Sequence, residues 1–201
     1  PLSAFFRLSS VAPVRQPVRH KRDGYVLVLG QVTGDKQLDE SEIRGMPPLQ
    51  RYVGRALPEG TPVFFRPHPA DRLAPHPLHE NLPRLPTDSF EEYSESWKGE
   101  SLADALRGAA FVVTINSTAI NEALIAGVPV LAFGPHLSIE AGAARQATVA
   151  TLADDINAMM LGWTPDQRSV DNYLAWLAEK QVHVSAFEDP ARTAAILGLV
   201  Q

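Results

Sequence analysis

The chain has 201 residues, of which 45% are hydrophobic and 20% charged, and its formal net charge is −5. This composition is typical of a globular protein and excludes a largely disordered chain, and the length suits one ordinary domain. The absence of cysteine excludes disulfides, thiolate metal sites and a cysteine nucleophile. No uncharged apolar run approaches the ~18 residues that a membrane-spanning helix needs.

The start of the chain is basic, whereas the remainder is acidic. Residues 1–22 contain five basic and no acidic residues, which leaves 13 basic against 23 acidic residues after them. A basic arm that contains proline can touch an anionic surface or link two domains, and we favour the linker. We therefore divide the chain into an arm, residues 1–24, and a folded domain, residues 25–201. The acidic domain has no basic stripe, which argues against nucleic-acid binding.

The predicted elements of the first half are short and are separated by proline-rich loops. Residues 25–30 form an apolar run that ends in glycine, and this run predicts a buried strand. Residues 49–57 have a weak helical periodicity, and residues 62–65 predict a second strand. We expect mostly loop over residues 70–88, with a brief strand near residues 84–85.

The second half alternates helices and strands more regularly. Ser101 is a plausible N-cap for the first of these helices, and proline stands at the start of the last. The predicted strands cover residues 111–114, 128–133 and 148–151, and the predicted helices cover residues 102–106, 119–126, 154–161, 169–180 and 190–199.

Strands that are almost entirely apolar and alternate with helices predict a parallel sheet covered on both faces. Ligands of such sheets bind beyond the carboxyl ends of the strands. Four polar loops directly follow predicted strands, at residues 31–35, 66–68, 116–118 and 134–136. We therefore expect these loops to converge on one rim and to form the site.

The turn over residues 116–118 lies between a strand and a helix. Hydroxyl and backbone N–H groups there favour an anion, but Ser117 or Thr118 can equally act as an ordinary N-cap worth ~1 kcal/mol. Glu122, one turn into the helix, can accept hydrogen bonds from ribose hydroxyls or remain a solvated helix residue. The sequence has neither the P-loop nor the three-glycine dinucleotide pattern, so a phosphate must be held differently.

Two other loops contain candidate catalytic groups. Prolines on both sides of His68 restrict its backbone, so its imidazole can be aimed at a phosphate or act as a general acid. The alternative is a loop histidine that packs on its prolines. Gly34 permits an unusual turn that presents Asp35 as a nucleophile or base, and the alternative is an ordinary turn aspartate.

We predict no metal site. His76 and His79 have a spacing seen in metal sites, but Pro77 between them breaks a helical i, i+3 pair.

Six short motifs occur together in an order that resembles a known family. In chain order they are Gly30-Gln31-Val32-Thr33-Gly34-Asp35, Arg66-Pro67-His68-Pro69, Thr114-Ile115-Asn116-Ser117-Thr118, Asn121-Glu122-Ala123-Leu124, Gly127-Val128-Pro129-Val130 and Phe133-Gly134. Over residues 25–140 this order resembles the capsule-polysaccharide β-Kdo transferases and related lipopolysaccharide Kdo transferases, which are GT-B-like enzymes that use CMP-Kdo. The resemblance implies a Rossmann-like α/β domain, the C-terminal nucleotide-binding half of a GT-B glycosyltransferase.

The resemblance also implies a role for each matching residue. Asp35 would be the nucleophile of a retaining reaction and would form a transient Kdo–enzyme adduct, and His68 would help CMP leave. An aspartate would then stabilise the oxocarbenium-like centre, and a histidine would stabilise the negative charge that grows on the phosphate. The residues implied to bind nucleotide and phosphate are Asn116, Ser117, Thr118, Glu122 (at the ribose) and Gly134, and those implied to bind the sugar are Gln31 and Arg66.

The partners implied by the resemblance are a CMP-activated acidic sugar as donor and a glycan or glycolipid as acceptor, with no cofactor, metal or nucleic acid. The chain starts at Pro1 without a signal-peptide pattern, and we expect the arm to lead from an absent N-terminal acceptor domain. We expect a cytoplasmic location, with at most peripheral contact with the inner membrane.

Other functions remain open alternatives. The His-Pro and Ser/Thr motifs also resemble those of sialyltransferases and of the CDP-glycerol polymerases of teichoic acid synthesis, so a cytidine nucleotide is a broader expectation than Kdo. The chain can also be a non-catalytic nucleotide- or glycan-binding module of a polysaccharide assembly protein, or a GT-B enzyme that acts on UDP-sugars.

Overall fold

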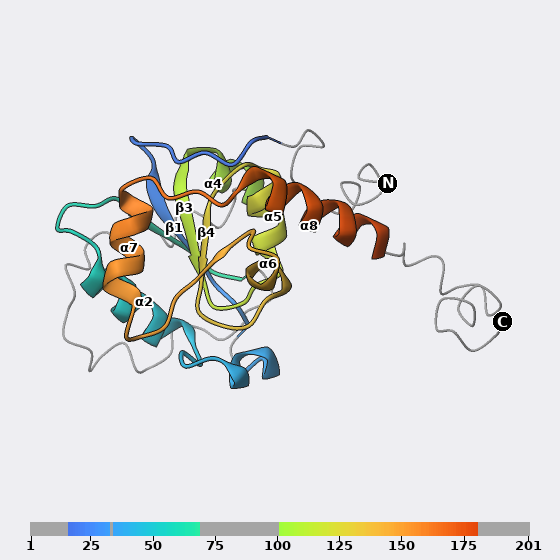
Figure 1. Ribbon diagram of the computed structural model, residues 1–201. Helices are drawn as coiled ribbons and strands as arrows, with labels where there is room; N and C mark the ends of the chain where they lie inside the picture. The colour runs from blue at the N-terminus through green and yellow to red at the C-terminus, as the bar shows by residue number, and fades with distance from the viewer. Residues whose placement is uncertain (1–15, 33, 69–100, 181–201) are drawn as a thin grey trace.

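A parallel sheet of five strands forms the centre of the structure, with the order β2-β1-β3-β4-β5 (Figure 1). The computed structural model describes residues 16–32, 34–68 and 101–180. Every adjacent pair of strands is parallel. The strands are Tyr25–Leu29 (β1), Val63–Arg66 (β2), Ala109–Thr114 (β3), Val130–Ala132 (β4) and Arg145–Gln146 (β5).

The central strands are buried on both faces, as their unbroken apolar runs predict. In β1, Leu27 and Leu29 belong to one hydrophobic cluster, whereas Val26 and Val28 belong to a second cluster on the opposite face. Successive side chains of a strand point to opposite faces, so a sheet that is apolar at every position needs cover on both sides.

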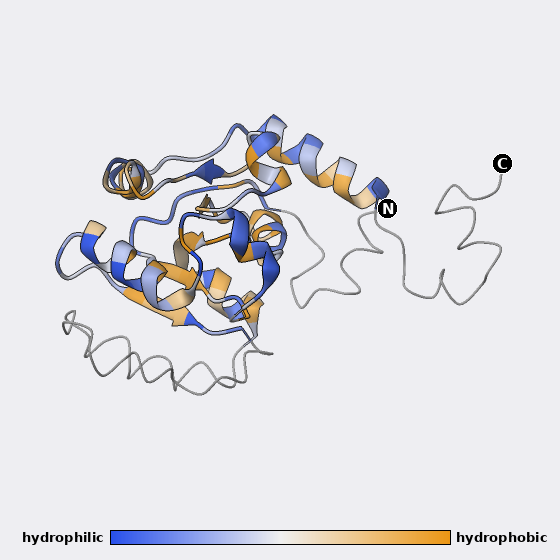
Figure 2. Cartoon of the chain, turned by 90° about the horizontal axis from the view of Figure 1, so that it is seen from below, coloured by the Kyte–Doolittle hydropathy of each residue, from blue (hydrophilic) through white to orange (hydrophobic). Residues whose placement is uncertain are grey.

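Helices of the described residues supply that cover on both faces (Figure 1). In Figure 2 the helix α8 has a hydrophobic and a hydrophilic side, as expected for a helix packed on a core. The predicted Rossmann-like α/β fold is therefore confirmed. The helices on the first face are Leu102–Gly108 (α4), Ala119–Ile125 (α5) and Gln167–Lys180 (α8), and those on the second are Met46–Ala56 (α2) and Leu152–Met160 (α7).

One predicted strand is wrong. Residues 148–151 form a turn, because the hydroxyl groups of Thr148 and Thr151 lie 3.0 Å apart and each accepts a hydrogen bond from the other residue's backbone N–H. The fifth strand is instead formed by Arg145–Gln146, just before this turn. The strand predicted near residues 84–85 and the helix predicted over 190–199 lie outside the described residues, as do His76 and His79.

The loop after β1 also contains an element that the sequence did not predict. A 3-10 helix, Lys36–Glu40 (η1), follows Asp35 directly. At the far end of α5, away from the carboxyl edge of the sheet, Gly127 has a φ of +76° and ends the helix as predicted, because glycine adopts this left-handed conformation without strain.

The part of the basic arm that the structure describes packs on the domain. Val18 is only 7% exposed and belongs to the hydrophobic core, and its backbone N–H donates to the Gln167 side chain at 2.9 Å. The backbone N–H of Arg19 donates to the Gly127 carbonyl at 3.0 Å. Val18 and Arg19 are therefore held against the first helical face.

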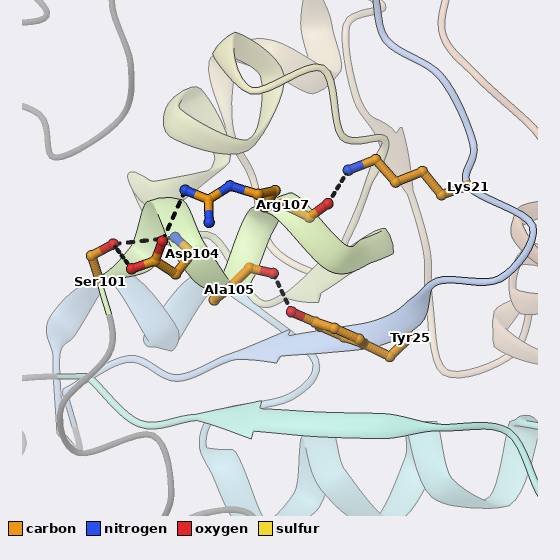
Figure 3. Close-up of polar contacts among 6 residues, drawn as sticks. All are labelled: Lys21, Tyr25, Ser101, Asp104, Ala105 and Arg107. Atoms are coloured by element: carbon orange, nitrogen blue, oxygen red, sulfur yellow. Dashed lines mark hydrogen bonds and ion pairs between the residues drawn. The ribbon is translucent and has the colours of Figure 1, made fainter.

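The helix α4 fixes the start of β1 through polar contacts (Figure 3). Ser101 caps α4, because its Oγ accepts from the Asp104 N–H at 3.2 Å. Tyr25 and Lys21 each donate a side-chain hydrogen bond to a carbonyl of α4, on Ala105 and Arg107 respectively. Among the described helices, none combines the length and the apolar character needed to cross a membrane.

Candidate functional site

The loops that follow β1 and β2 lie against each other at the carboxyl edge of the sheet. The Gly30 N–H donates to the Arg66 carbonyl at 2.8 Å. A Cβ atom on Gly30 would lie only 2.9 Å from the backbone nitrogen of His68, so the two loops approach as closely as they do only because this residue is glycine. The close approach places Arg66 and His68 beside the first loop.

The chain reverses its direction across the sheet between β2 and β3. It runs from β1 outward to β2 and then returns to β3 on the other side of β1. The crevice at such a switch point, beyond the carboxyl ends of the two strands, is where open α/β sheets bind ligands. The candidate site is therefore centred between the loops after β1 and β3.

Two buried amide side chains bridge this switch point. Gln31 follows β1 and is 4% exposed, and Asn116 follows β3 and is 5% exposed. Gln31 Nε2 donates to Asn116 Oδ1 at 2.8 Å, and Asn116 N–H donates to Gln31 Oε1 at 2.9 Å. Asn116 Nδ2 donates in turn to the Gln37 carbonyl at 2.7 Å. The sequence predicted both residues for this site, and the structure brings them together.

Asp35 lies at the start of η1 and acts as its N-cap. Its Oδ1 accepts from the Gln37 N–H at 3.0 Å, which is the pattern of an aspartate turn. The preceding Gly34 has a φ of +79°, the unusual turn that the sequence predicted. The side chain of Asp35 is partly exposed, and among the described residues it forms no ion pair. One carboxylate oxygen of Asp35 therefore has a local structural role at the carboxyl edge of the sheet.

Ser117 and Thr118 stand where β3 passes into α5. Ser117 is 8% exposed and its Oγ accepts from the Ala119 N–H at 3.3 Å, so it shares in the local capping of the helix. Thr118 is exposed and makes no side-chain cap bond. Of the two hydroxyl groups, that of Thr118 is the more open to a ligand.

Arg66 of β2 lies within electrostatic reach of Glu122 of α5. Burial lowers the pKa of Arg66, and the Glu122 carboxylate opposes this effect. Both side chains are partly buried, as is His68. The rim therefore combines a guanidinium, a carboxylate and an imidazole, which suits a ligand with both anionic and hydroxyl groups.

The loop after β4 forms the remaining side of the candidate site. Gly134 is buried, and a Cβ atom there would lie 3.0 Å from Asn116 Nδ2. Two residues beyond it, His136 caps the short helix α6, Leu137–Glu140, because its Nδ1 accepts from the Ser138 N–H at 3.2 Å. Burial lowers the pKa of His136, which keeps the ring neutral and able to accept.

An aromatic contact extends from His136 along the first helical face. Its ring meets Tyr173 edge-on with centroids 6.5 Å apart, and Tyr173 donates to Asn121 Oδ1 at 2.7 Å. Burial raises the pKa of Tyr173 to about 12. Sequence reasoning assigned no role to Gln37 or His136. Gln37 stands two residues after Asp35, and His136 stands two residues after Gly134. Aspartate and glycine favour turns, so this position after a turn was the signal in the sequence that could have identified both residues.

Hollows lined by described residues occur at the opposite, amino-terminal edge of the sheet. One of about 200 Å³ is lined by residues that include His20, Arg22 and Gly24, and one of about 600 Å³ also reaches Leu161. Open α/β sheets bind their ligands beyond the carboxyl ends of the strands, so we keep the candidate site at the carboxyl rim. Within residues 16–32, 34–68 and 101–180, no three potential metal-ligating side chains gather into a metal site.

Comparison with known proteins finds no match in sequence and a distant likeness among solved structures. No protein-family model matches the sequence, and no curated protein sequence matches it either. Among solved structures, the chain is similar to Thermosulfurimonas dismutans KpsC, a beta Kdo 2,7 transferase, with 20% sequence identity and a TM-score of 0.45. The similarity covers 74% of this chain and 44% of that protein, so the chain spans less than half of its length.

Proposed function

We propose that this chain is the nucleotide-binding domain of a GT-B glycosyltransferase that transfers Kdo, or a similar acidic sugar, from its CMP form to a glycan or glycolipid acceptor. The observation that carries the proposal is the meeting of the motif-bearing loops at the switch point of the sheet. Gln31 and Asn116 are hydrogen-bonded to each other there. The loops that contain Asp35 and Arg66 contact this pair or the residues next to it.

The reaction would proceed with retention in two displacements. The Asp35 carboxylate forms a bond to the anomeric carbon while the bond from that carbon to the phosphate oxygen breaks, and CMP leaves with the electron pair. The acceptor hydroxyl then attacks the same carbon, the bond to Asp35 breaks, and the hydroxyl proton passes to a base or to water. Each displacement inverts the centre, so the two together retain its configuration.

Positive charge and hydrogen-bond donors of the rim would stabilise the departing phosphate. Arg66 supplies a guanidinium and His68 an imidazole at the end of β2, and Thr118 supplies an exposed hydroxyl after β3. Glu122 would accept hydrogen bonds from the ribose. Because the net charge of the chain is −5, these local hydrogen-bond donors, and not a general positive field, would have to hold the anionic sugar donor.

One observation favours a second function, that of a non-catalytic nucleotide- or glycan-binding module. Asp35 already has a structural task as the cap of η1, so its position does not require a catalytic role. In a module of this kind, the rim would bind the nucleotide but no group would attack the sugar.

Mass spectrometry of the intact protein separates the two functions. After incubation with CMP-Kdo, the enzyme is expected to carry one added Kdo residue, which the Asp35→Asn variant lacks, and CMP is expected to accumulate. An adduct that forms equally on Asp35→Asn, or CMP-Kdo that stays intact in the presence of the wild-type protein and an acceptor glycan, would overturn the transferase proposal.

A further inference from the structure

We infer that Gln31 and Asn116 are positioning residues, which hold Asp35 in a fixed relation to the Ser117 turn through a relay of hydrogen bonds. This inference rests on the proposed function of the rim, and it changes the role of both amides. The resemblance implies that they touch the sugar or the phosphate, whereas their contacts in the structure are to the protein itself.

The first step of the relay joins two loops. Gln31 donates through Nε2 and accepts through Oε1, and both partners belong to Asn116, at 2.8 and 2.9 Å. Both residues are at least 95% buried. A buried polar pair that satisfies itself is costly to separate, because separation leaves unpaired groups out of reach of water.

The second step reaches the carboxylate. Asn116 Nδ2 donates to the Gln37 carbonyl at 2.7 Å, and the N–H of the same Gln37 donates to Asp35 Oδ1 at 3.0 Å. Because one residue carries both bonds, a shift of the Asn116 amide moves the peptide that holds the Asp35 carboxylate. The relay therefore runs from Gln31 through Asn116 and Gln37 to Asp35.

The amide of Asn116 is also confined from the side. A Cβ atom on Gly134 would lie 3.0 Å from Nδ2 and 3.2 Å from Cγ of Asn116, so the backbone of the loop after β4 rests against it. The side chain thus cannot swing away without moving a third loop. This close packing makes the relay a fixed element of the rim.

The relay needs an amide, and a carboxylate of the same shape cannot replace it. Asn116 must accept from Gln31 through one atom and donate to the Gln37 carbonyl through the other. Asn116→Asp would set a carboxylate oxygen against that carbonyl oxygen and lose the donor. Gln31→Met keeps the approximate shape, adds no charge and removes both bonds to Asn116.

Asn157 provides a matched control for the charge change. It is an exposed residue of α7 on the second helical face. Asn157→Asp makes the same chemical change as Asn116→Asp, but outside the relay.

The relay acts on the loop of Asp35 and leaves the nucleotide-binding turn intact. That turn has its own bonds, from Ala119 N–H to Ser117 Oγ and from Ile120 N–H to the Ser117 carbonyl. Loss of the relay should therefore slow the sugar-transfer step without a matching loss of CMP affinity. A displacement of a reacting group by about 1 Å can cost about a hundredfold in rate.

Hydrogen exchange of the full chain tests the geometry without reference to activity. Asn116→Asp and Gln31→Met should speed amide exchange over residues 34–41 at least about tenfold, while exchange in α5 stays within about twofold of the wild type. Asn157→Asp should change neither segment. Unchanged exchange over residues 34–41 would overturn the inference. Equal acceleration in α5 and α7 would overturn it as well, because it would show general support of the fold.

Activity measurements on the same variants test the consequence. Transfer from CMP-Kdo should fall at least about tenfold in Gln31→Met, with CMP affinity within about threefold of the wild type. A parallel loss of affinity and transfer would contradict a positioning role. If the wild-type protein does not bind CMP, the proposed function fails, and the exchange data still decide whether the relay holds the loop.

Discussion

Gln31 and Asn116 are 85 residues apart in the sequence and are joined by two hydrogen bonds, one in each direction. The pair ties the end of β1 to the end of β3, where the strand order reverses. Because such a reversal is where α/β sheets bind ligands, this pair marks the centre of the candidate site.

The first prediction separates the two roles of Asp35. Asn at this position can still accept from the Gln37 N–H and cap η1, but it has no carboxylate to attack the sugar. Asp35→Asn should therefore lower transfer at least about a hundredfold with unchanged CMP affinity and stability. Steady-state kinetics measure the rate of transfer, and calorimetry measures the CMP affinity. The Asp35→Ala variant additionally shows the effect of losing the cap of η1. Wild-type transfer by Asp35→Asn would leave Asp35 only its structural role.

The second prediction concerns nucleotide affinity. Glu122→Ala and Thr118→Ala should each weaken CMP binding roughly tenfold, because each removes a hydrogen bond to the nucleotide worth about 1–2 kcal/mol. The control is Glu140→Ala, which removes an exposed carboxylate on α6. Calorimetric affinities for CMP that are equal in Glu122→Ala and Glu140→Ala would argue against a ribose contact.

The third prediction tests the close approach of the first two loops. In Gly30→Ala the new methyl group would meet the backbone of residues 66–68 at 2.9–3.0 Å, and a backbone cannot give way as a flexible side chain can. The free energy of unfolding in urea should fall by about 1–3 kcal/mol. Gly45→Ala serves as the control, since the nearest atom there would be 3.8 Å away. Equal stabilities of the two variants would contradict the predicted clash.

The fourth prediction concerns pH. Burial lowers the pKa of His136 below the usual 6.5, and the neutral ring accepts from the Ser138 N–H. As the pH falls below about 6.5, the unfolded chain takes up the proton more readily than the folded chain, so the free energy of unfolding decreases.

His136→Asn isolates this effect, because asparagine can still cap α6 but does not titrate. Chemical unfolding between about pH 7 and about pH 5 should show a smaller loss of stability in the variant than in the wild type. The pKa of His20 is lowered too, but that residue is present in both proteins and cancels in the comparison. Identical pH dependence of the two proteins would show that His136 does not contribute.

The layers of the fold could be predicted because they depend on local hydrophobic pattern. The runs at residues 25–30 and 111–114 are apolar at nearly every position. This pattern is typical of a strand whose sheet is covered on both faces. The strand predicted over residues 148–151 failed for a local reason as well. β-Branched threonine favours strands, but the hydroxyl groups of Thr148 and Thr151 bond to each other and to the backbone, and they form a turn.

The contacts within the site could be predicted only in part. The sequence placed Gln31 and Asn116 at one rim, because each directly follows a buried strand. Their mutual hydrogen bonds depend on the register of β1 against β3, which no local pattern determines. For Asp35 the sequence left a turn aspartate and a nucleophile open, and the structure adds the cap of η1 without removing the second role.

Calorimetric titration of the full chain with CMP, CDP, UMP and UDP decides which nucleotide the rim binds. We expect CMP to bind most tightly, and Glu122→Ala to weaken this binding. A preference for CDP or for a uridine nucleotide would contradict the CMP-sugar donor, and no binding of any of the four would contradict a nucleotide-binding rim altogether.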